Sequence, residues 1–333
     1  MKAGRAVRGL IDRRRLKDYI NYVAFQRPRI IRPPSEWRSY FLPITSGCSN
    51  ARCTFCNYYY GARLRIRRTE EVREEIEALY LYKKYGIFVP SMPPLVYELA
   101  DMWDGRRIFL QDGDALVYPF KRLKEILEHL NTRFPAVERI AAYATPQDLL
   151  RRTVEELRAL RELKLSILYM GLESGSDEIL SRVHKGVDSR AMVEAARKAK
   201  EASITLSVTV ILGLGGREAS KEHAISTARV LSEMQPEFVG ALTLTLVPPA
   251  PLYTDWKEGR FQPLSPFESL EELRLMIEHL ELRDCFFSST HASNYFTVKG
   301  RLPEEKERML MELDEILQKR DPRLLRPEYL RGL

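Results

Sequence analysis

The sequence is poor in cysteine and histidine and has no long hydrophobic run. Among 333 residues there are 4 cysteines and 5 histidines, and three of the cysteines lie between positions 48 and 56. Such a trio cannot form a disulfide framework, and the clustering indicates a reducing compartment. No stretch approaches the roughly 20 apolar residues that a membrane-spanning helix needs. No apolar run follows the N-terminus, as it would in a signal peptide. We therefore expect a cytoplasmic protein that does not enter a membrane.

Acidic residues are fewer than basic ones, and the imbalance is concentrated near the N-terminus. The chain has a formal net charge of +7, and in residues 1–33 only Asp12 and Asp18 are acidic. We expect residues 1–39 to form a basic extension, with a helix over 5–25. The charge permits an anionic partner such as nucleic acid. A solvated, arginine-rich surface is the favoured alternative, because no aromatic–basic pattern accompanies it.

From residue 40 onward, short apolar strands alternate with amphipathic helices, which is typical of parallel β/α units in an α/β protein. The predicted strands are 40–45, 107–111, 139–143, 166–170, 205–212 and 238–246. The predicted helices are 69–85, 120–131, 148–162, 189–201, 219–234 and 266–280. Six units predict a partial (β/α)6, TIM-like barrel of parallel strands over residues 40–283. Residues 284–333 are expected to close it with an irregular stretch and a C-terminal helical cap, whose helix covers 303–318.

The first predicted strand is followed by Cys48-Ser-Asn-Ala-Arg-Cys53-Thr-Phe-Cys56. Three thiols this close in sequence can hold a metal ion or an iron–sulfur cluster. Structural zinc sites use four ligands, and no histidine or fourth cysteine lies nearby. A [4Fe–4S] cluster held by three cysteines leaves one iron open to a ligand. The pattern favours the cluster and leaves zinc as the alternative.

This loop resembles the signature of the radical S-adenosylmethionine (radical SAM) superfamily, in particular a single-cluster branch with a Gly-Cys-Ser…Cys-Thr-Phe-Cys loop. The family spacing is C-x3-C-x2-C with an aromatic residue before the third cysteine, where Phe55 stands; here the first gap has one extra residue. The resemblance implies a [4Fe–4S] cluster on Cys48, Cys53 and Cys56, with the amino and carboxylate groups of S-adenosylmethionine (SAM) on the fourth iron. The chain also distantly resembles oxygen-independent coproporphyrinogen dehydrogenases.

In a parallel barrel, the loops after the strands build the site. Asp112-Gly113-Asp114 follows the second predicted strand, where the family carries a Gly-Gly-Glu motif that contacts the SAM amino group. The resemblance therefore assigns these three residues to SAM. A plain Asp-Gly-Asp turn is the alternative.

Two later strand ends extend the resemblance. Glu173 and Ser174 follow the fourth strand, and the family places a ribose-binding polar residue there and a cation for the SAM carboxylate at the position of Lys185. After the fifth strand, Gly213 begins a Gly-Leu-Gly-Gly stretch similar to the adenine-side motif, and Thr209 matches a ribose contact. The alternatives are an N-cap cluster and an ordinary surface lysine.

The segment after the sixth unit is polar and aromatic. It contains Cys285, His291, Asn294 and Tyr295. A lone histidine is most often structural, but a closing loop carries function more often than a core element does. We list these four residues as candidates for a catalytic or substrate-facing role, with Cys285 either buried or a hydrogen-atom donor.

The resemblance implies an enzyme that cleaves SAM to a 5′-deoxyadenosyl radical, which abstracts hydrogen from an unidentified substrate, a small molecule or RNA. A reductant protein such as a flavodoxin or ferredoxin is the expected partner. Only Cys285 remains for a second cluster, so methylthiolating activity is not expected. The alternatives are an RNA-modifying radical SAM enzyme that uses the basic extension, a zinc-stabilised nucleic-acid-binding module, and a non-catalytic iron–sulfur protein.

Overall fold

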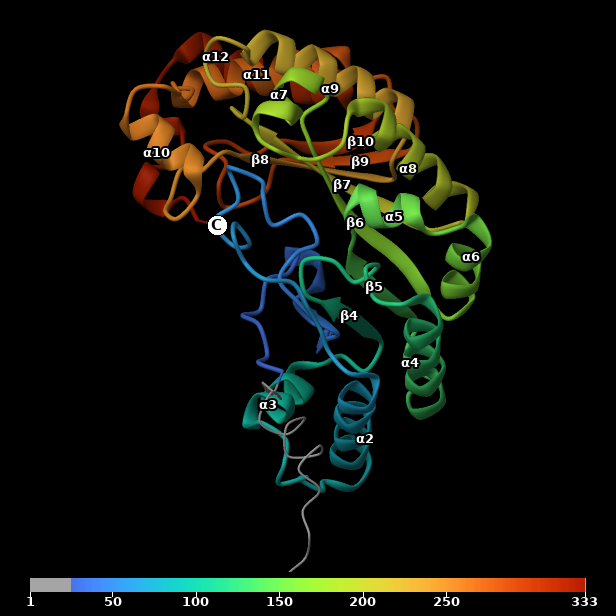
Figure 1. Cartoon of the computed structure of the whole chain (residues 1–333). Helices are drawn as coiled ribbons and strands as arrows, with labels where there is room; N and C mark the ends of the chain where they lie inside the picture. The colour runs from blue at the N-terminus through green and yellow to red at the C-terminus, as the bar shows by residue number, and fades with distance from the viewer. Residues whose placement is uncertain (1–24, 333) are drawn as a thin grey trace, which may run out of the picture.

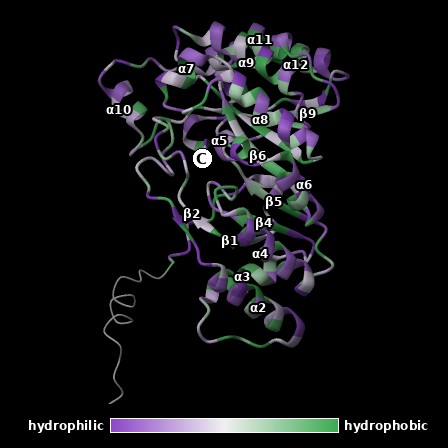
Figure 2. Cartoon of the chain, turned by 45° about the vertical axis from the view of Figure 1, so that its right-hand side comes forward, coloured by the Kyte–Doolittle hydropathy of each residue, from purple (hydrophilic) through white to green (hydrophobic). Residues whose placement is uncertain are grey.

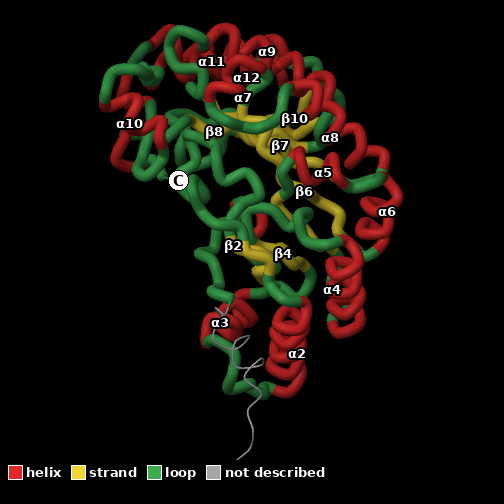
Figure 3. The backbone as a smooth tube through the Cα atoms, in the orientation of Figure 1, coloured by secondary structure: helices red, strands yellow, loops and turns green. Residues whose placement is uncertain are grey.

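The structure is a computed structural model, and it describes residues 25–332. Residues 5–24 of the expected N-terminal helix lie outside the described part, and Phe25 belongs to no helix. The main sheet of the described chain is curved and has helices along its outer side, as Figure 1 shows. The loops gather on the concave side of the sheet (Figure 3).

The main sheet has the strand order β1-β4-β5-β6-β7-β8-β9-β10. Neighbours from β1 to β9 pair in parallel, and β10 pairs antiparallel with β9. The strands are β1 (Tyr40–Pro43), β4 (Arg107–Gln111), β5 (Arg139–Tyr143), β6 (Leu165–Glu173), β7 (Thr205–Leu212), β8 (Phe238–Thr243), β9 (Cys285–Ser288) and β10 (Lys299–Leu302). Within residues 25–332, β1 and β10 do not pair with each other, so the barrel stays open. The predicted partial barrel of six parallel β/α units is confirmed.

Two predictions about the strands need correction. The segment 40–45 forms β1 and then turns into β2 (Thr45–Ser46), which pairs with β3 (Arg65–Ile66) in a separate ribbon. The tail after residue 284 is not irregular, because β9 and β10 extend the main sheet. Cys285 and Phe287 are buried in β9, which gives the strand an apolar face against the helices.

The helices are α2 (Thr69–Tyr85), α3 (Pro94–Met102), α4 (Phe120–Arg133), α5 (Pro146–Arg151), α6 (Val154–Glu162), α7 (Asp177–Arg182), α8 (Ser189–Glu201), α9 (Ser220–Met234), α10 (Pro251–Lys257), α11 (Pro266–His279) and α12 (Lys306–Lys319). In Figure 2 hydrophobic and hydrophilic residues alternate along them, as amphipathic helices require. The predicted helix 148–162 is two helices. The Thr153 hydroxyl accepts from the Glu156 amide and caps α6, so a second helix begins there.

Burial along β7 shows which side of the sheet is packed. Leu206, Val208 and Val210 are buried in the main core, whereas Ser207 and Thr209 face a cavity on the concave side. The segment before β1 crosses this concave side. Arg139 and the Tyr169 hydroxyl both bond to the buried carboxylate of Glu36, at 2.6 and 2.7 Å. The described part of the basic extension is therefore a structural part of the barrel.

Candidate functional site

The three neighbouring cysteines lie on a loop between β2 and β3. All three are free thiols; Cys53 is buried, and Cys48 and Cys56 are half-buried. The Thr54 amide donates to Val183 O at the end of α7, at 3.0 Å. Phe55 packs with the small apolar cluster around α7 and α10. The loop is thereby fixed to the rim of the barrel where the strands end.

Two of the three sulfur atoms accept hydrogen bonds from nitrogen donors. Asn50 Nδ2 lies 3.2 Å from Cys53 Sγ, and the Tyr59 amide nitrogen lies 3.4 Å from Cys56 Sγ. Donors of this kind stabilise the negative charge of a metal-bound thiolate. The donor set therefore fits an iron–sulfur cluster.

Burial opposes the ionisation of the three thiols. It raises the pKa of Cys48 to about 12 and that of Cys53 to about 11. The pKa of Cys56 is also raised by burial. A metal ligand must be a thiolate, so loading of the site is coupled to the release of these protons.

The described residues contain no group of three His, Cys, Asp or Glu side chains that could hold one metal ion. Zinc binds sulfur at about 2.3 Å and so needs its thiols close together around one point. Among the described residues, the three thiols of the cysteine loop do not form such a group.

The carboxylates of the Asp-Gly-Asp stretch bind the cysteine loop itself. Asp112 accepts from the Gly47 amide at 2.9 Å and from the Tyr59 hydroxyl. Asp114 is fully buried and accepts from the Ser49 hydroxyl at 2.7 Å. Both carboxylates thus hold residues of the cysteine loop against the end of β4.

The Asp112–Asp114 stretch is tightly packed, and the pKa values of both its carboxyl groups are raised. A Cβ on Gly113 would lie 2.9 Å from the Gly47 carbonyl oxygen and 3.0 Å from the Tyr59 ring, so glycine is required there. Burial, with a further contribution from Asp148, raises the pKa of Asp114 well above its usual range. Burial also raises the pKa of Asp112.

Glu173 and Lys185 form a buried ion pair beside the cysteine loop. The Lys185 Nζ atom lies 2.9 Å from Glu173 Oε1, and both side chains are about one-tenth exposed. Burial opposes the charge of Lys185, but Glu173 and Cys53 raise the net pKa of the ammonium. A Cβ on Gly171 would lie 1.9 Å from Glu173 Oε1, so this glycine makes room for the pair.

Ser174 and Gly213 contact a buried network that the sequence did not indicate. The Ser174 hydroxyl lies 2.9 Å from His223 Nδ1, and the Gly213 amide donates to Glu272 Oε1 at 2.6 Å. Both partners are buried, on α9 and α11. The network ties the ends of β6 and β7 to the outer helices, and no motif in the sequence signals it. Thr209 instead faces the cavity on the concave side.

The four candidates in the tail have different surroundings. His291 lines the cavity on the concave side. Asn294 is buried, and its amide donates to Ala241 O and Ser289 O, both at 2.8 Å. The Tyr295 hydroxyl bonds to Glu328 and Arg331 near the C-terminal end. Cys285 is buried in the helix-facing layer of the sheet.

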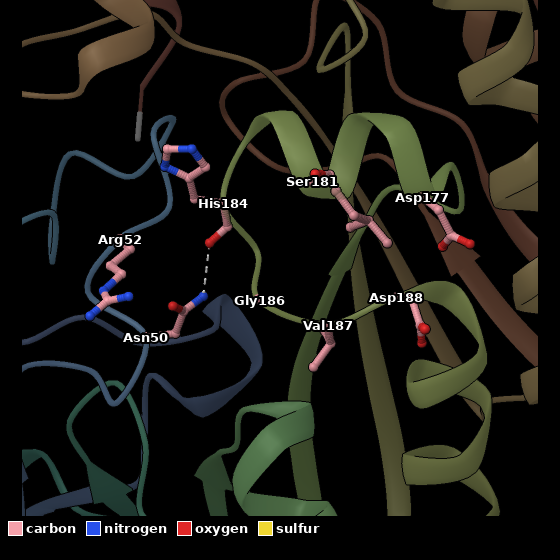
Figure 4. A pocket seen from close by; sticks show the side chains of 9 residues that line it. Asn50, Arg52, Asp177, Ser181, His184, Gly186, Val187 and Asp188 are labelled. Carbon is pink, nitrogen blue, oxygen red and sulfur yellow. Dashed lines mark hydrogen bonds between the residues drawn. The ribbon is translucent and has the colours of Figure 1, made fainter.

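A surface groove runs beside the cysteine loop and α7, and Asn50 forms part of its wall. Figure 4 shows the Asn50 carboxamide pointing at the backbone of His184, whose carbonyl oxygen it meets at 3.3 Å. The same nitrogen lies 2.6 Å from Lys185 O. Asn50 therefore connects a cysteine thiol, the loop that carries Lys185 and the protein surface. Apart from the position of Asn50 between two cysteines, no sequence feature indicated this role.

An open barrel of parallel strands with a three-cysteine loop at its rim defines the class of protein. The profile of the radical SAM superfamily matches residues 42–229. The chain belongs to the radical SAM superfamily, whose members are enzymes that use a [4Fe–4S] cluster and SAM.

Curated relatives are similar over part of their length. A tRNA-2-methylthio-N(6)-dimethylallyladenosine synthase of Bordetella avium is 27% identical over 233 residues, which are 67% of this chain and 45% of the relative. The heme chaperone HemW of Bacillus subtilis is 28% identical over 177 residues, 51% of this chain and 44% of the relative. The chain spans less than half the length of these relatives.

Solved structures also align with the chain. The coproporphyrinogen III oxidase of Escherichia coli, a radical SAM enzyme, aligns with a TM-score of 0.49 at 16% identity, covering 72% of this chain and 51% of that one. Methylornithine synthase aligns with a TM-score of 0.48 at 19% identity, covering 85% and 81%. Among the described residues, no helix combines the length and the apolar character needed to cross a membrane.

Proposed function

We propose that the chain binds one [4Fe–4S] cluster through Cys48, Cys53 and Cys56, and SAM across the adjoining strand ends, and abstracts a hydrogen atom from a small molecule. The observation that carries this proposal is the anchoring of a three-thiol loop beside a buried Glu173–Lys185 pair. When bound, the reduced cluster supplies one electron that splits SAM into methionine and a 5′-deoxyadenosyl radical. The residues of the chain bind, orient and shield the reactants.

Lys185 is the group best suited to bind the SAM carboxylate. Its ammonium is charged, buried and held next to the cysteine loop. In the structure it is neutralised by Glu173, so a carboxylate ligand replaces or shares that partner. Glu173 is then available to accept from the ribose hydroxyls. Gly171 leaves space at this point because it carries no side chain.

Asp112 and Asp114 act by positioning the cysteine loop rather than by binding the SAM amino group directly. Their oxygen atoms are engaged by Gly47, Tyr59 and Ser49. Ser174 and Gly213 likewise support the site through His223 and Glu272. Thr209 lies on the cavity side, where it can contact both the nucleoside and the substrate.

Enzymes of this superfamily need a reductant and a substrate. A flavodoxin or ferredoxin in a cytoplasmic setting is our proposal for the reductant, in keeping with the free thiols of the chain. Some relatives are named for activity on tRNA, but the chain matches less than half of their length. RNA therefore remains the second candidate substrate, and the cavity inside the barrel favours a small molecule.

The test is anaerobic reconstitution with iron and sulfide, followed by dithionite and SAM. The wild type should produce 5′-deoxyadenosine even without the natural substrate, and Cys53→Ala should produce none. Glu173→Ala should weaken SAM binding by about 1–3 kcal/mol, because hydrogen bonds to the ribose are lost. A fully loaded, reduced protein that leaves SAM intact would refute the proposed activity.

A further inference from the structure

A cavity of about 400 Å³ lies on the concave side of the sheet. Tyr143, Tyr169, Ser207 and Phe238 form one layer of its wall, because they are successive partners in the registers of β5 to β8. The segment from Arg32 to Ser35 lines the cavity from the opposite side. The cavity is therefore bordered by the barrel and by the segment before β1, is partly open to solvent, and has room for a small molecule.

Three hydroxyl groups in this cavity have no hydrogen-bond partner among the described residues. They belong to Tyr143, Ser207 and Thr209, on two different strands. The Tyr169 hydroxyl, by contrast, is bonded to Glu36 and Ser35. All three residues are partly exposed, so their hydroxyls are accessible from the cavity. A ligand in the cavity can therefore accept or donate hydrogen bonds at these three positions.

The charges around the cavity have one sign. Arg32, an exposed residue, lines it; its guanidinium carbon lies 5.0 Å from the centre of the Phe41 ring and its Nη1 donates to Trp37 O at 3.4 Å. Glu36 lies behind Tyr169 and is paired with Arg139, and no aspartate or glutamate is among the described residues that line the cavity. An anionic group has a charged partner here, and an ammonium group has no counter-charge.

His291 adds a second donor. The Ser293 amide donates to His291 Nδ1 at 3.1 Å, so Nδ1 is the acceptor and the ring proton sits on Nε2. Aromatic rings form much of the remaining wall, including Tyr169, Phe238 and Phe286. Such walls favour a flat apolar body.

The cavity adjoins the groups proposed to bind SAM. Thr209 pairs with Gly171 in the register of β6 and β7. Gly171 is the residue over which the Glu173–Lys185 pair lies. Neighbouring strands lie about 4.8 Å apart, so a molecule that touches the Thr209 hydroxyl is next to the strand over which that pair lies.

We infer that the substrate is a small carboxylic acid with a planar, unsaturated body and no ammonium group. Arg32 binds its carboxylate, the aromatic walls hold its body, and Tyr143, Ser207 and Thr209 bond to its polar substituents. The inference rests on the proposed function, because it assigns the cavity to the hydrogen donor. It disfavours α-amino acids, whose ammonium group would have no counter-charge in the cavity.

The test uses three probes with one phenylpropyl body: 3-phenylpropionate, 3-phenylpropan-1-ol and 3-phenylpropylamine. Their dissociation constants are measured by equilibrium dialysis against the reconstituted full chain, with SAM present. The carboxylate should bind at least about tenfold more tightly than the amine, since a charge-assisted bond contributes more than about 1.4 kcal/mol. Arg32→Met should remove this preference.

Arg38→Met is the matched control. Arg38 belongs to the same segment but stacks on Trp37 and does not line the cavity, so the preference should survive. Equal binding of amine and carboxylate, absence of binding by all three probes, or the same loss in both variants would overturn the inference. The same samples are assayed for 5′-deoxyadenosine. Cleavage of SAM without a carboxylate preference refutes the substrate class alone, whereas a preference without cleavage refutes the proposed function alone.

Discussion

The side chain of Asn50 joins a cysteine of the loop to the backbone after α7. Its amide nitrogen lies 3.2 Å from Cys53 Sγ and 2.6 Å from Lys185 O. Hydrogen bonds to the sulfur ligands favour the reduced, more negative state of a cluster. The Asn50 side chain therefore links the position of Lys185 to the midpoint potential of a cluster held by Cys53.

We predict that Asn50→Ala shifts the midpoint potential of the cluster to a more negative value, measured by a redox titration followed by electron paramagnetic resonance (EPR). Gln147→Ala is the matched control. Gln147 donates to the same Lys185 carbonyl at 2.9 Å, and no hydrogen bond joins it to a described sulfur atom. An unchanged potential in Asn50→Ala, or an equal shift in the control, would contradict this role.

The cysteines differ in the effect expected of their loss. Cys53→Ala should abolish the four-iron centre, because three thiolates are needed to hold it. Cys285→Ala should retain about four irons per chain, since Cys285 is buried in the helix-facing core layer. Iron and sulfide analysis after reconstitution measures both. Retention of four irons by Cys53→Ala would show that the ligands lie elsewhere.

At the scale of elements, the segment before β1 is held by a buried charge cluster. Glu75 on α2 accepts from Arg27 and Arg67 at 2.7 and 2.6 Å, and also from the Tyr40 hydroxyl. Burial works against the charged form, but the two arginines lower the net pKa of Glu75. The cluster fixes the crossing segment to the first β/α unit.

We predict that Glu75→Gln lowers the free energy of unfolding by about 3–5 kcal/mol, because it leaves two buried guanidinium groups without a counter-charge. Urea unfolding monitored by circular dichroism measures the change. Glu74→Gln, at the exposed neighbouring position on α2, should be nearly neutral. A loss of less than about 1 kcal/mol in Glu75→Gln would show that the ion pairs are not structural.

The network that joins β7 to α11 predicts a dependence of stability on pH. Burial raises the pKa of Glu272 to about 7, so the folded chain favours the neutral carboxyl group. This contribution to stability is complete below the unfolded pKa of about 4.5 and is lost as pH rises through about 7. A shift of this size corresponds to about 3 kcal/mol.

Glu272→Gln removes this titration and keeps an acceptor for the Gly213 amide. Between pH 4.5 and pH 8, the stability of the variant relative to the wild type should therefore rise by about 3 kcal/mol. Parallel urea unfolding series at the two pH values measure the difference. A constant difference across this range would show that Glu272 does not titrate as described.

The elements show what sequence patterns can predict. Helices α2 and α8 begin and end at the predicted residues. Helix α2 stops at Gly86, whose φ of +68° suits glycine. The hydrophobic pattern predicted one helix over 148–162, but the N-cap residue Thr153 separates two helices there. It also failed at β9 and β10, which are held by pairing with strands distant in sequence rather than by a local signal.

At the scale of the whole molecule, the strand-end rule explains why the site could be outlined from the sequence. The cysteine loop, the Asp112–Asp114 stretch, Glu173 and Lys185 were all expected at one rim, and the structure brings them together there. Their mutual contacts could not be predicted, because they depend on side-chain geometry. Asp112 bonding to the cysteine loop is one example, and the pairing of Glu173 with Lys185 is another.

The contacts of the tail residues could not be predicted from the sequence either. His291 and Asn294 are three positions apart, yet His291 lines the cavity and Asn294 bonds to the backbone of β8. The segment before β1 is the clearest case. Its basic composition gave no sign that Glu36 and Arg32 would line or support a cavity inside the barrel.

The central claim is that Cys48, Cys53 and Cys56 hold a cluster whose open iron binds SAM next to Lys185. The most direct measurement is the EPR spectrum of the dithionite-reduced chain with and without SAM. We predict a [4Fe–4S]⁺ signal whose g values change when SAM is added to the wild type, and a change that needs more SAM in Lys185→Met. A reduced four-iron signal that SAM leaves unchanged at saturating concentration would contradict the account.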